Sequence, residues 1–283
     1  MPGERIQKVL SAMGFGSRRE IERWIEQGRI KINGKTCALG DRVNPGDWMH
    51  VDGKRIVVRK QRAQTRVIMY HKPVGEVCTR DDPEGRPTVF DHLPKAGRAR
   101  WVSIGRLDIN TSGLLLFTTN GELANRVMHP SQQIEREYAV RVNGDVRRDI
   151  LRQLTTEVML DDGPAHFDEI QDGGGTGYNK WYYVVIREGR KREVRRLWEA
   201  VGIRVSRLIR VRYGLIILPK RLRKGRIKEL DADEIRQLAE SVGLEIDVKS
   251  QPAMGKSARP DRDQRHGKRA PRKKRSPVKK RTR

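Results

Sequence analysis

Asp108 is the residue whose type and setting most suggest chemistry. It stands in the segment GRLDINTSGLLLF, a polar turn between two apolar runs of strand length, residues 101–104 and 114–118. A carboxylate placed there would lie at a sheet edge that opens onto a cleft, where it can act as a nucleophile or a general base. The same residues also fit an Asx-type turn in which Asp108 caps the backbone near Thr111 and Ser112. Taken on its own, the pattern favours that structural turn.

Metal, redox and nucleotide-cofactor chemistry find little support in the sequence. Cys37 and Cys78 stand far apart without a CxxC neighbour, and the six histidines lack the spacing of metal ligands. The run GGGTG at residues 173–177 has the composition of a loop and lacks the context of a dinucleotide or phosphate-binding site. We therefore expect no metal site and no cofactor.

The charge of the chain is strongly positive and unevenly distributed. Lys and Arg number 61 against 36 Asp and Glu, which gives a net charge of +25. Residues 249–283 carry +13, residues 1–62 carry +7, and residues 63–248 carry the remaining +5. Such a field recruits polyanions by counterion release, and the C-terminal stretch lacks the apolar stripe of a membrane-surface helix. We expect nucleic acid rather than a membrane as the partner, although the tail also fits a solvated end that binds nothing.

Length and patterning indicate two folded domains and a tail. A chain of 283 residues has room for about two domains. We predict a small module at residues 1–62, a larger domain at 63–246 and a basic disordered tail at 247–283, with the polar stretch KQRAQTR at 60–66 as the linker. No window approaches the roughly 18 apolar residues of a membrane span, and the start MPGERIQKVL lacks the apolar run of a secretory signal. This favours the cytoplasm.

The first 62 residues carry the signals of two helices followed by a small sheet. Apolar residues recur at helical spacing over residues 5–13. The sequence SRRE at residues 17–20 is a capping box that opens a second helix, and Gly28 is placed to end it. Alternating residues then lead into an Asn33-Gly34 turn, the strongest short signal for a β-hairpin. These elements make one compact unit with a basic helix face.

The larger domain is rich in strand signals. We predict strands in the apolar or alternating runs VIMYHKP, WVSI, LLLFT, YAVRV and WYYVVI, and one helix over residues 193–200. Few of the intervening segments have helical spacing. The pattern predicts an α+β fold, a mixed and largely antiparallel sheet with a central cleft.

The N-terminal segment RIQKVLSAMGFGSRREIERWIEQGRIKINGK resembles the S4 RNA-binding domain along nearly its whole length. The resemblance implies that the SRRE helix and the following hairpin hold structured RNA. It makes Arg18, Arg19, Lys31 and Lys35 the expected phosphate contacts. Each of them singly could be a solvated charge, but their clustering on one small module favours a shared role.

The segment GRLDINTSGLLLF is similar to the active-site signature of the pseudouridine synthases that act on ribosomal RNA. The resemblance reverses the preference for a structural turn, because it implies that Asp108 is the essential catalytic residue. EREYAVRV is similar to the second motif of that family, which implies that the ring of Tyr138 stacks on the target uracil. In isolation Tyr138 would be an ordinary core residue.

REGRKREVRRLWEAVG followed by RLIRVRYG is similar to the third motif of the same family. It implies that Arg195 pairs with the catalytic carboxylate and keeps it ionised, and that Leu208 lines the pocket. Arg192 and Arg196 lie close by in the sequence and leave that assignment open. We expect Arg192, with Arg106 and Leu208, to contact the substrate.

The resemblance implies an enzyme that breaks the N1 glycosidic bond of a uridine, rotates the uracil and rejoins it through C5. It implies no cofactor, and large-subunit ribosomal RNA or a pre-ribosomal particle as the partner. We expect the protein to be a monomer. The target base must be flipped out of its stack to be reached. The rival hypothesis is a non-catalytic, ribosome-associated RNA-binding protein, which explains the charge equally well but not the motifs around Asp108.

Overall fold

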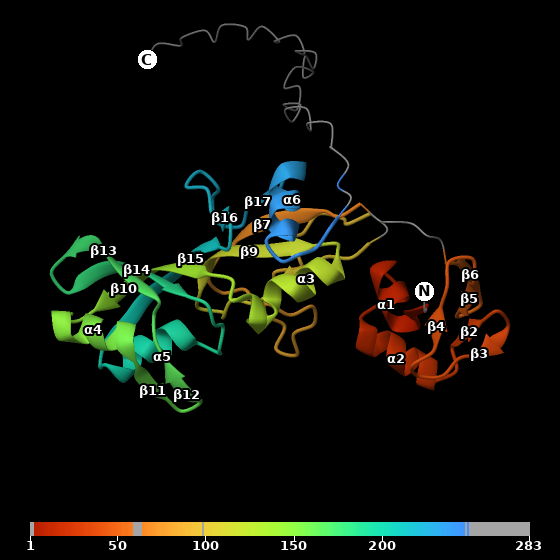
Figure 1. The fold of residues 1–283 in the computed structure, drawn as a ribbon, viewed down its shortest axis with the longest axis horizontal. Coiled ribbons are helices and arrows are strands. Elements are labelled where there is room, and N and C mark those ends of the chain that lie inside the picture. The colour runs from red at the N-terminus through yellow and green to blue at the C-terminus, as the bar shows by residue number, and fades with distance from the viewer. Residues whose placement is uncertain (1–2, 59–63, 98, 247, 249–283) are drawn as a thin grey trace, which may run out of the picture. The chain divides into compact units, whose positions relative to one another are not determined.

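The structure is a computed structural model that describes residues 3–58, 64–97, 99–246 and 248. Nearly all of the predicted basic tail, residues 247–283, lies outside the described residues. Within the described part, no helix is long and apolar enough to cross a membrane. The described residues before and after the gap at 59–63 form separate sheets, and each region is considered by itself (Figure 1).

Residues 4–57 fold as the sequence predicts, two helices followed by a small sheet. Ser17 Oγ accepts a hydrogen bond from the Glu20 amide at 3.1 Å, and the Glu20 carboxylate accepts one from the Ser17 amide at 3.2 Å, so the predicted capping box is confirmed. The hairpin turns at Asn33-Gly34, where both residues have positive φ. The elements are β1 (Glu4–Arg5), α1 (Ile6–Ala12), α2 (Arg18–Glu26), β2 (Ile30–Ile32), β3 (Lys35–Thr36), β4 (Arg42–Val43), β5 (Trp48–Val51) and β6 (Lys54–Val57).

The second region is built on a nine-stranded sheet in the order β13-β14-β10-β15-β9-β7-β17, with β16 beside β15 and β8 beside β9. All the pairings are antiparallel except that of β15 with β9, which confirms the predicted α+β fold. Its strands are β7 (Val67–Lys72), β8 (Val102–Ile104), β9 (Ser112–Thr118), β10 (Arg136–Asn143), β13 (Glu169–Thr176), β14 (Asn179–Ile186), β15 (Arg204–Tyr213), β16 (Ile216–Ile217) and β17 (Ile227–Glu229).

Helices cover both faces of this sheet. Those of the region are α3 (Gly121–Met128), α4 (Arg148–Thr156), α5 (Glu193–Ala200) and α6 (Ala232–Glu240), and a separate hairpin pairs β11 (Val158–Leu160) with β12 (Gly163–Ala165). One apolar core joins α4 and α5 to one face, and a second joins α3 and α6 to the other. Figure 1 shows α4 and α5 beside the β13-β14-β10 end and α3 and α6 beside the β9-β7-β17 end. Successive side chains of β7 and β9 point alternately into the two cores, which explains why every residue of β9 is buried.

One detail of the sequence prediction is wrong. The glycine run at residues 173–177 was expected to be a loop, but most of it lies in β13, with irregular pairing between Asp172 and Gly175. Pairing with β14 overrides the weak strand preference of glycine.

Gly113 allows the parallel contact that brings β15 against the turn carrying Asp108. Its φ is +112°, and a Cβ at this position would overlap the backbone of Arg210 on β15. Only glycine avoids both the strain and the overlap.

We expect Gly113→Ala to lower the free energy of unfolding by about 2 kcal/mol or more, because backbone strain and overpacking each cost about 1–3 kcal/mol. Urea unfolding of the variant measures this. Gly121→Ala is the matched control, since a Cβ in this first turn of α3 meets nothing closer than 3.9 Å. Equal stability of the two variants would contradict the argument.

Candidate active site

A pocket of about 420 Å³ opens beside the turn that carries Asp108. It contains five of the six residues predicted to be catalytic or to bind substrate in this region: Arg106, Asp108, Tyr138, Arg192 and Leu208. They come from the turn before β9, from β10, from the start of α5 and from β15. The other lining residues are Gly105, Leu107, Thr111, Met128, Arg136, Ile186, Gly189, Arg190, Lys191, Glu193, Val194, Arg210 and Tyr213.

The side chain of Asp108 does not cap its own turn. The turn is closed through the backbone, where the Asp108 carbonyl accepts a hydrogen bond from the Thr111 amide at 3.0 Å. The half-buried carboxylate has no hydrogen bond or ion pair among the residues that the structure describes. The Asx-turn interpretation is therefore wrong, and the carboxylate is free to act on a molecule in the pocket.

Lys72 stabilises this turn by hydrogen bonds to its backbone, a role that the sequence did not suggest. Its side chain is completely buried at the end of β7, and its Nζ donates to the carbonyl oxygens of Thr111 at 2.9 Å, Pro73 at 3.0 Å and Asp108 at 3.1 Å. Burial lowers the pKa of Lys72, while the nearby Cys78, Glu76 and Asp108 oppose that shift. The available signal was a lysine at the end of VIMYHKP, a run with the pattern of a buried strand, since lysine is almost never fully buried without partners.

Tyr138 and Leu208 form apolar walls of the pocket. Tyr138 lies on β10 and is 8% exposed, and Leu208 on β15 is 5% exposed. The Tyr138 hydroxyl has no hydrogen-bond partner in the described part of the chain. Arg106 is exposed at the same pocket and is likewise unpaired among the described residues. A flat ring, an aliphatic side chain and a free cation suit a base with its sugar and phosphate.

Arg195 does not pair directly with Asp108, contrary to our prediction. Arg195 lies on α5, and its buried guanidinium donates to the carbonyl oxygens of Asn110 at 2.9 Å and Val205 at 3.1 Å. It forms no ion pair with Asp108 in the described structure. Burial and the neighbouring Arg192 lower the pKa of Arg195, and the charge of Asp108 acts in the opposite direction. Both Nη atoms are committed to backbone carbonyls, so Arg195 fixes the turn two residues beyond Asp108.

Arg210 is a buried cation that lines the pocket and that sequence reasoning missed. It is 2% exposed, its Nε donates to the Leu114 carbonyl at 2.8 Å, and its guanidinium lies 4.9 Å from the centre of the Tyr213 ring. Its Nη2 is buried without a partner in the described structure. The signal was present in RLIRVRYG, because the residue two positions after Leu208 shares its face of the strand.

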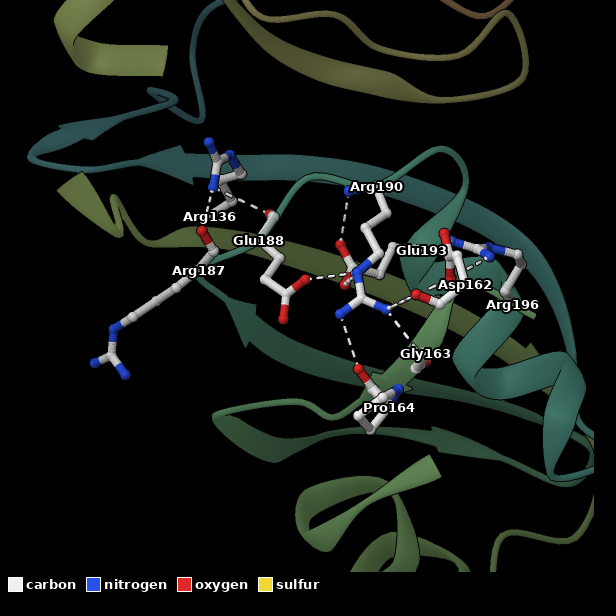
Figure 2. A network of polar contacts seen from close by, with 9 residues as sticks. All are labelled: Arg136, Asp162, Gly163, Pro164, Arg187, Glu188, Arg190, Glu193 and Arg196. Carbon is white, nitrogen blue, oxygen red and sulfur yellow. Dashed lines mark hydrogen bonds and ion pairs between the residues drawn. The ribbon is translucent and has the colours of Figure 1, made fainter. Parts of the chain in front are cut away.

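Hydrogen bonds and ion pairs connect the basic loop between β14 and α5, residues 187–192, to the β11–β12 hairpin (Figure 2). Arg190 Nε donates to Glu188 at 2.6 Å and its Nη2 to the Pro164 carbonyl at 2.8 Å. Arg196 holds Asp162 with two hydrogen bonds of 2.8 and 2.9 Å, which keep the pKa of that carboxyl below its usual value. The predicted alternative to Arg195, Arg196, is thus tied to the hairpin and does not line the pocket.

Comparison with known proteins shows the family of the chain. Residues 66–200 match the family described as RNA pseudouridylate synthase, and residues 4–48 match the S4 domain. A relative named ribosomal large subunit pseudouridine synthase B, from Escherichia coli strain K12, is 58% identical over 259 residues. That alignment covers 90% of this chain and 89% of the relative. The chain belongs to the RNA pseudouridylate synthase family.

Two other similar proteins are a longer relative and a solved structure. A ribosomal large subunit pseudouridine synthase B from Pseudomonas aeruginosa is 56% identical over 245 residues, which are 86% of this pseudouridylate synthase and 63% of that longer protein. A solved structure described as a pseudouridylate synthase aligns with a TM-score of 0.58 at 25% identity. It covers 83% of this chain and is itself covered completely.

The S4 domain of this pseudouridylate synthase presents the four cations predicted to touch RNA. Arg18 and Arg19 lie in the first turn of α2, and Lys31 and Lys35 lie on β2 and β3. All four are exposed, and none forms an ion pair with the described residues. Their availability to phosphates agrees with the prediction, which the structure does not test.

Proposed function

We propose that this pseudouridylate synthase isomerises one uridine of large-subunit ribosomal RNA, the substrate in the names of its relatives. The observation that carries the proposal is the unpaired carboxylate of Asp108, which shares a pocket with Tyr138 and Leu208. A structural aspartate at this turn would have used its side chain to close it.

Each residue at the pocket has a separate role in the proposed reaction. Asp108 is the nucleophile or base, and the flipped uracil lies against the ring of Tyr138 with Leu208 beside it. Arg210 is a desolvated cation with a free Nη2 donor. It takes the role of the positive charge beside the catalytic carboxylate, which the sequence analysis assigned to Arg195. Arg195 and Lys72 are positioning residues, since both donate to carbonyls of the turn. Arg106 and Arg192 contact the sugar and phosphates at the pocket.

The division of labour follows the charge of the chain. Residues 1–62 and the basic tail at 247–283 supply affinity through phosphates, and residues 63–246 supply the chemistry. The reaction involves no redox change and requires no cofactor. The enzyme works as a monomer in the cytoplasm, where it meets ribosomal RNA or a pre-ribosomal particle.

Unmodified large-subunit ribosomal RNA labelled with tritium at uridine C5 tests the function. We expect the full-length protein to release tritium, because the hydrogen at C5 leaves when the new glycosidic bond forms there. Small-subunit ribosomal RNA with the same label is the control and should release none. Release from neither RNA would leave an RNA-binding protein without this activity, and release from small-subunit RNA alone would overturn the substrate.

A further inference from the structure

A second cavity lies next to the active-site pocket and is lined largely by cationic and polar side chains. Its volume is about 800 Å³, and it shares Arg192 and Leu208 with the first pocket. Its cations are Arg192, Arg195, Arg204, Arg207 and Lys224, against the single carboxylate of Glu199. We call this cavity the basic groove.

Most of these cations have no internal partner. Arg204, Arg207 and Lys224 form no ion pair with any residue that the structure describes. Arg192 makes one long contact with Glu199, at 3.3 Å, between a half-buried arginine and an exposed glutamate. The rim network of Arg190 and Arg196, by contrast, is satisfied by acidic partners. Like charges gathered without partners repel one another, so the groove is suited to an external anion.

A β-bulge in β15 shapes one wall of the groove. The pairing of β15 with β10 shifts between Arg141 and Val142, and the shift leaves Ser206 as the extra residue of a β-bulge. Arg141 Nε donates to Ser206 Oγ at 2.9 Å, and that hydroxyl donates to the Arg141 carbonyl at 3.0 Å. The bulge aims side chains that a regular strand would aim elsewhere, as bulges beside active sites do.

Neutral polar groups and one buried cation complete the lining. Asn110, Ser112 and Asn143 face the groove together with Ser206. The Nε atom of Arg195 is buried and has no partner in the described structure, although its two other nitrogen atoms are satisfied. Unpaired arginines together with amide and hydroxyl side chains are the groups that proteins use to contact phosphates.

From these observations, and resting on the proposed function, we infer that the basic groove binds backbone phosphates of the nucleotides on one side of the flipped uridine. A flipped uridine stays covalently joined to both neighbours, so its flanking backbone must leave the pocket across an adjoining surface. The shared Arg192 and Leu208 make the groove such a surface. Arg204 and Arg207 each neutralise a phosphate of that strand.

The double variant Arg204→Gln, Arg207→Gln tests the inference. Its affinity for unmodified large-subunit ribosomal RNA is measured by filter binding at several salt concentrations, using the full-length protein. Between about 50 and about 200 mM salt, the variant should lose about tenfold less affinity than the wild type, because each lost phosphate contact lowers the salt slope by about 0.7–0.9. The charge-preserving variant Arg204→Lys, Arg207→Lys should keep the wild-type slope.

Arg148→Gln, Arg152→Gln on α4 is the matched control, because it removes two exposed arginines that do not line the groove. A slope for the groove variant that equals that of the wild type, or of this control, would overturn the inference. Tritium release by the wild type separates it from the proposed function. Groove-dependent binding without release would contradict the function alone, and release with an unchanged slope would contradict the groove alone.

Discussion

Asp108→Asn should abolish tritium release from large-subunit ribosomal RNA while leaving the affinity for that RNA within a few fold of the wild type. The change keeps the size of the side chain and removes the charge that a nucleophile or base requires. Binding should survive because phosphate contacts made elsewhere dominate affinity for RNA. The measurements are tritium release under single-turnover conditions and filter binding of the same RNA.

Asp145→Asn provides the control, since Asp145 is exposed and does not line the pocket. This variant should turn over like the wild type. Asp108→Asn should unfold close to the wild-type midpoint, because the carboxylate makes no hydrogen bond or ion pair within the described structure and only its longer-range attraction to the buried cations Lys72 and Arg195 is lost. Normal turnover by Asp108→Asn would remove Asp108 from the catalytic role and return it to the structural turn that its sequence alone favours.

Local signals in the sequence were sufficient to predict the framework of the fold. The capping box at Ser17 and Glu20 and the turn at Asn33 and Gly34 depend on contacts within a few residues, and the structure contains both. The helix expected over residues 193–200 is α5. Strand runs such as WYYVVI combine β-branched and aromatic residues that pack well on a pleated sheet.

Contacts between distant parts of the chain were not predictable in the same way. The resemblance indicated a cation beside Asp108, and local spacing could not decide which donors it would use. Arg195 turns to carbonyls of the β15 and Asp108 segments, while Arg210 reaches the pocket from β15. Both outcomes depend on the parallel pairing of β9 with β15, which Gly113 permits. Strand order is a property of the whole sheet and leaves little trace in short motifs.

Lys72→Met should cost on the order of 3 kcal/mol of stability and reduce kcat about 100-fold. Methionine fills much of the same space but leaves the carbonyls of Pro73, Asp108 and Thr111 without their shared donor. Each hydrogen bond to a charged group contributes about 1.5–3 kcal/mol, and relief of the buried charge offsets part of the loss. The turn then shifts, and a displacement of about 1 Å in a catalytic group costs about 100-fold in rate.

The role of Lys72 as a positioning residue makes a sharper claim than a loss of stability. Well below the melting temperature, where the variant is fully folded, its kcat should still be reduced while its affinity for RNA stays near that of the wild type. Lys228→Met on β17 is the matched control, because it removes an exposed lysine from the strand next to β7 and should leave kcat unchanged. If folded Lys72→Met protein turned over at the wild-type rate, Lys72 would stabilise the sheet without aiming Asp108, and the free carboxylate would owe its placement to Arg195 and the backbone of the turn alone.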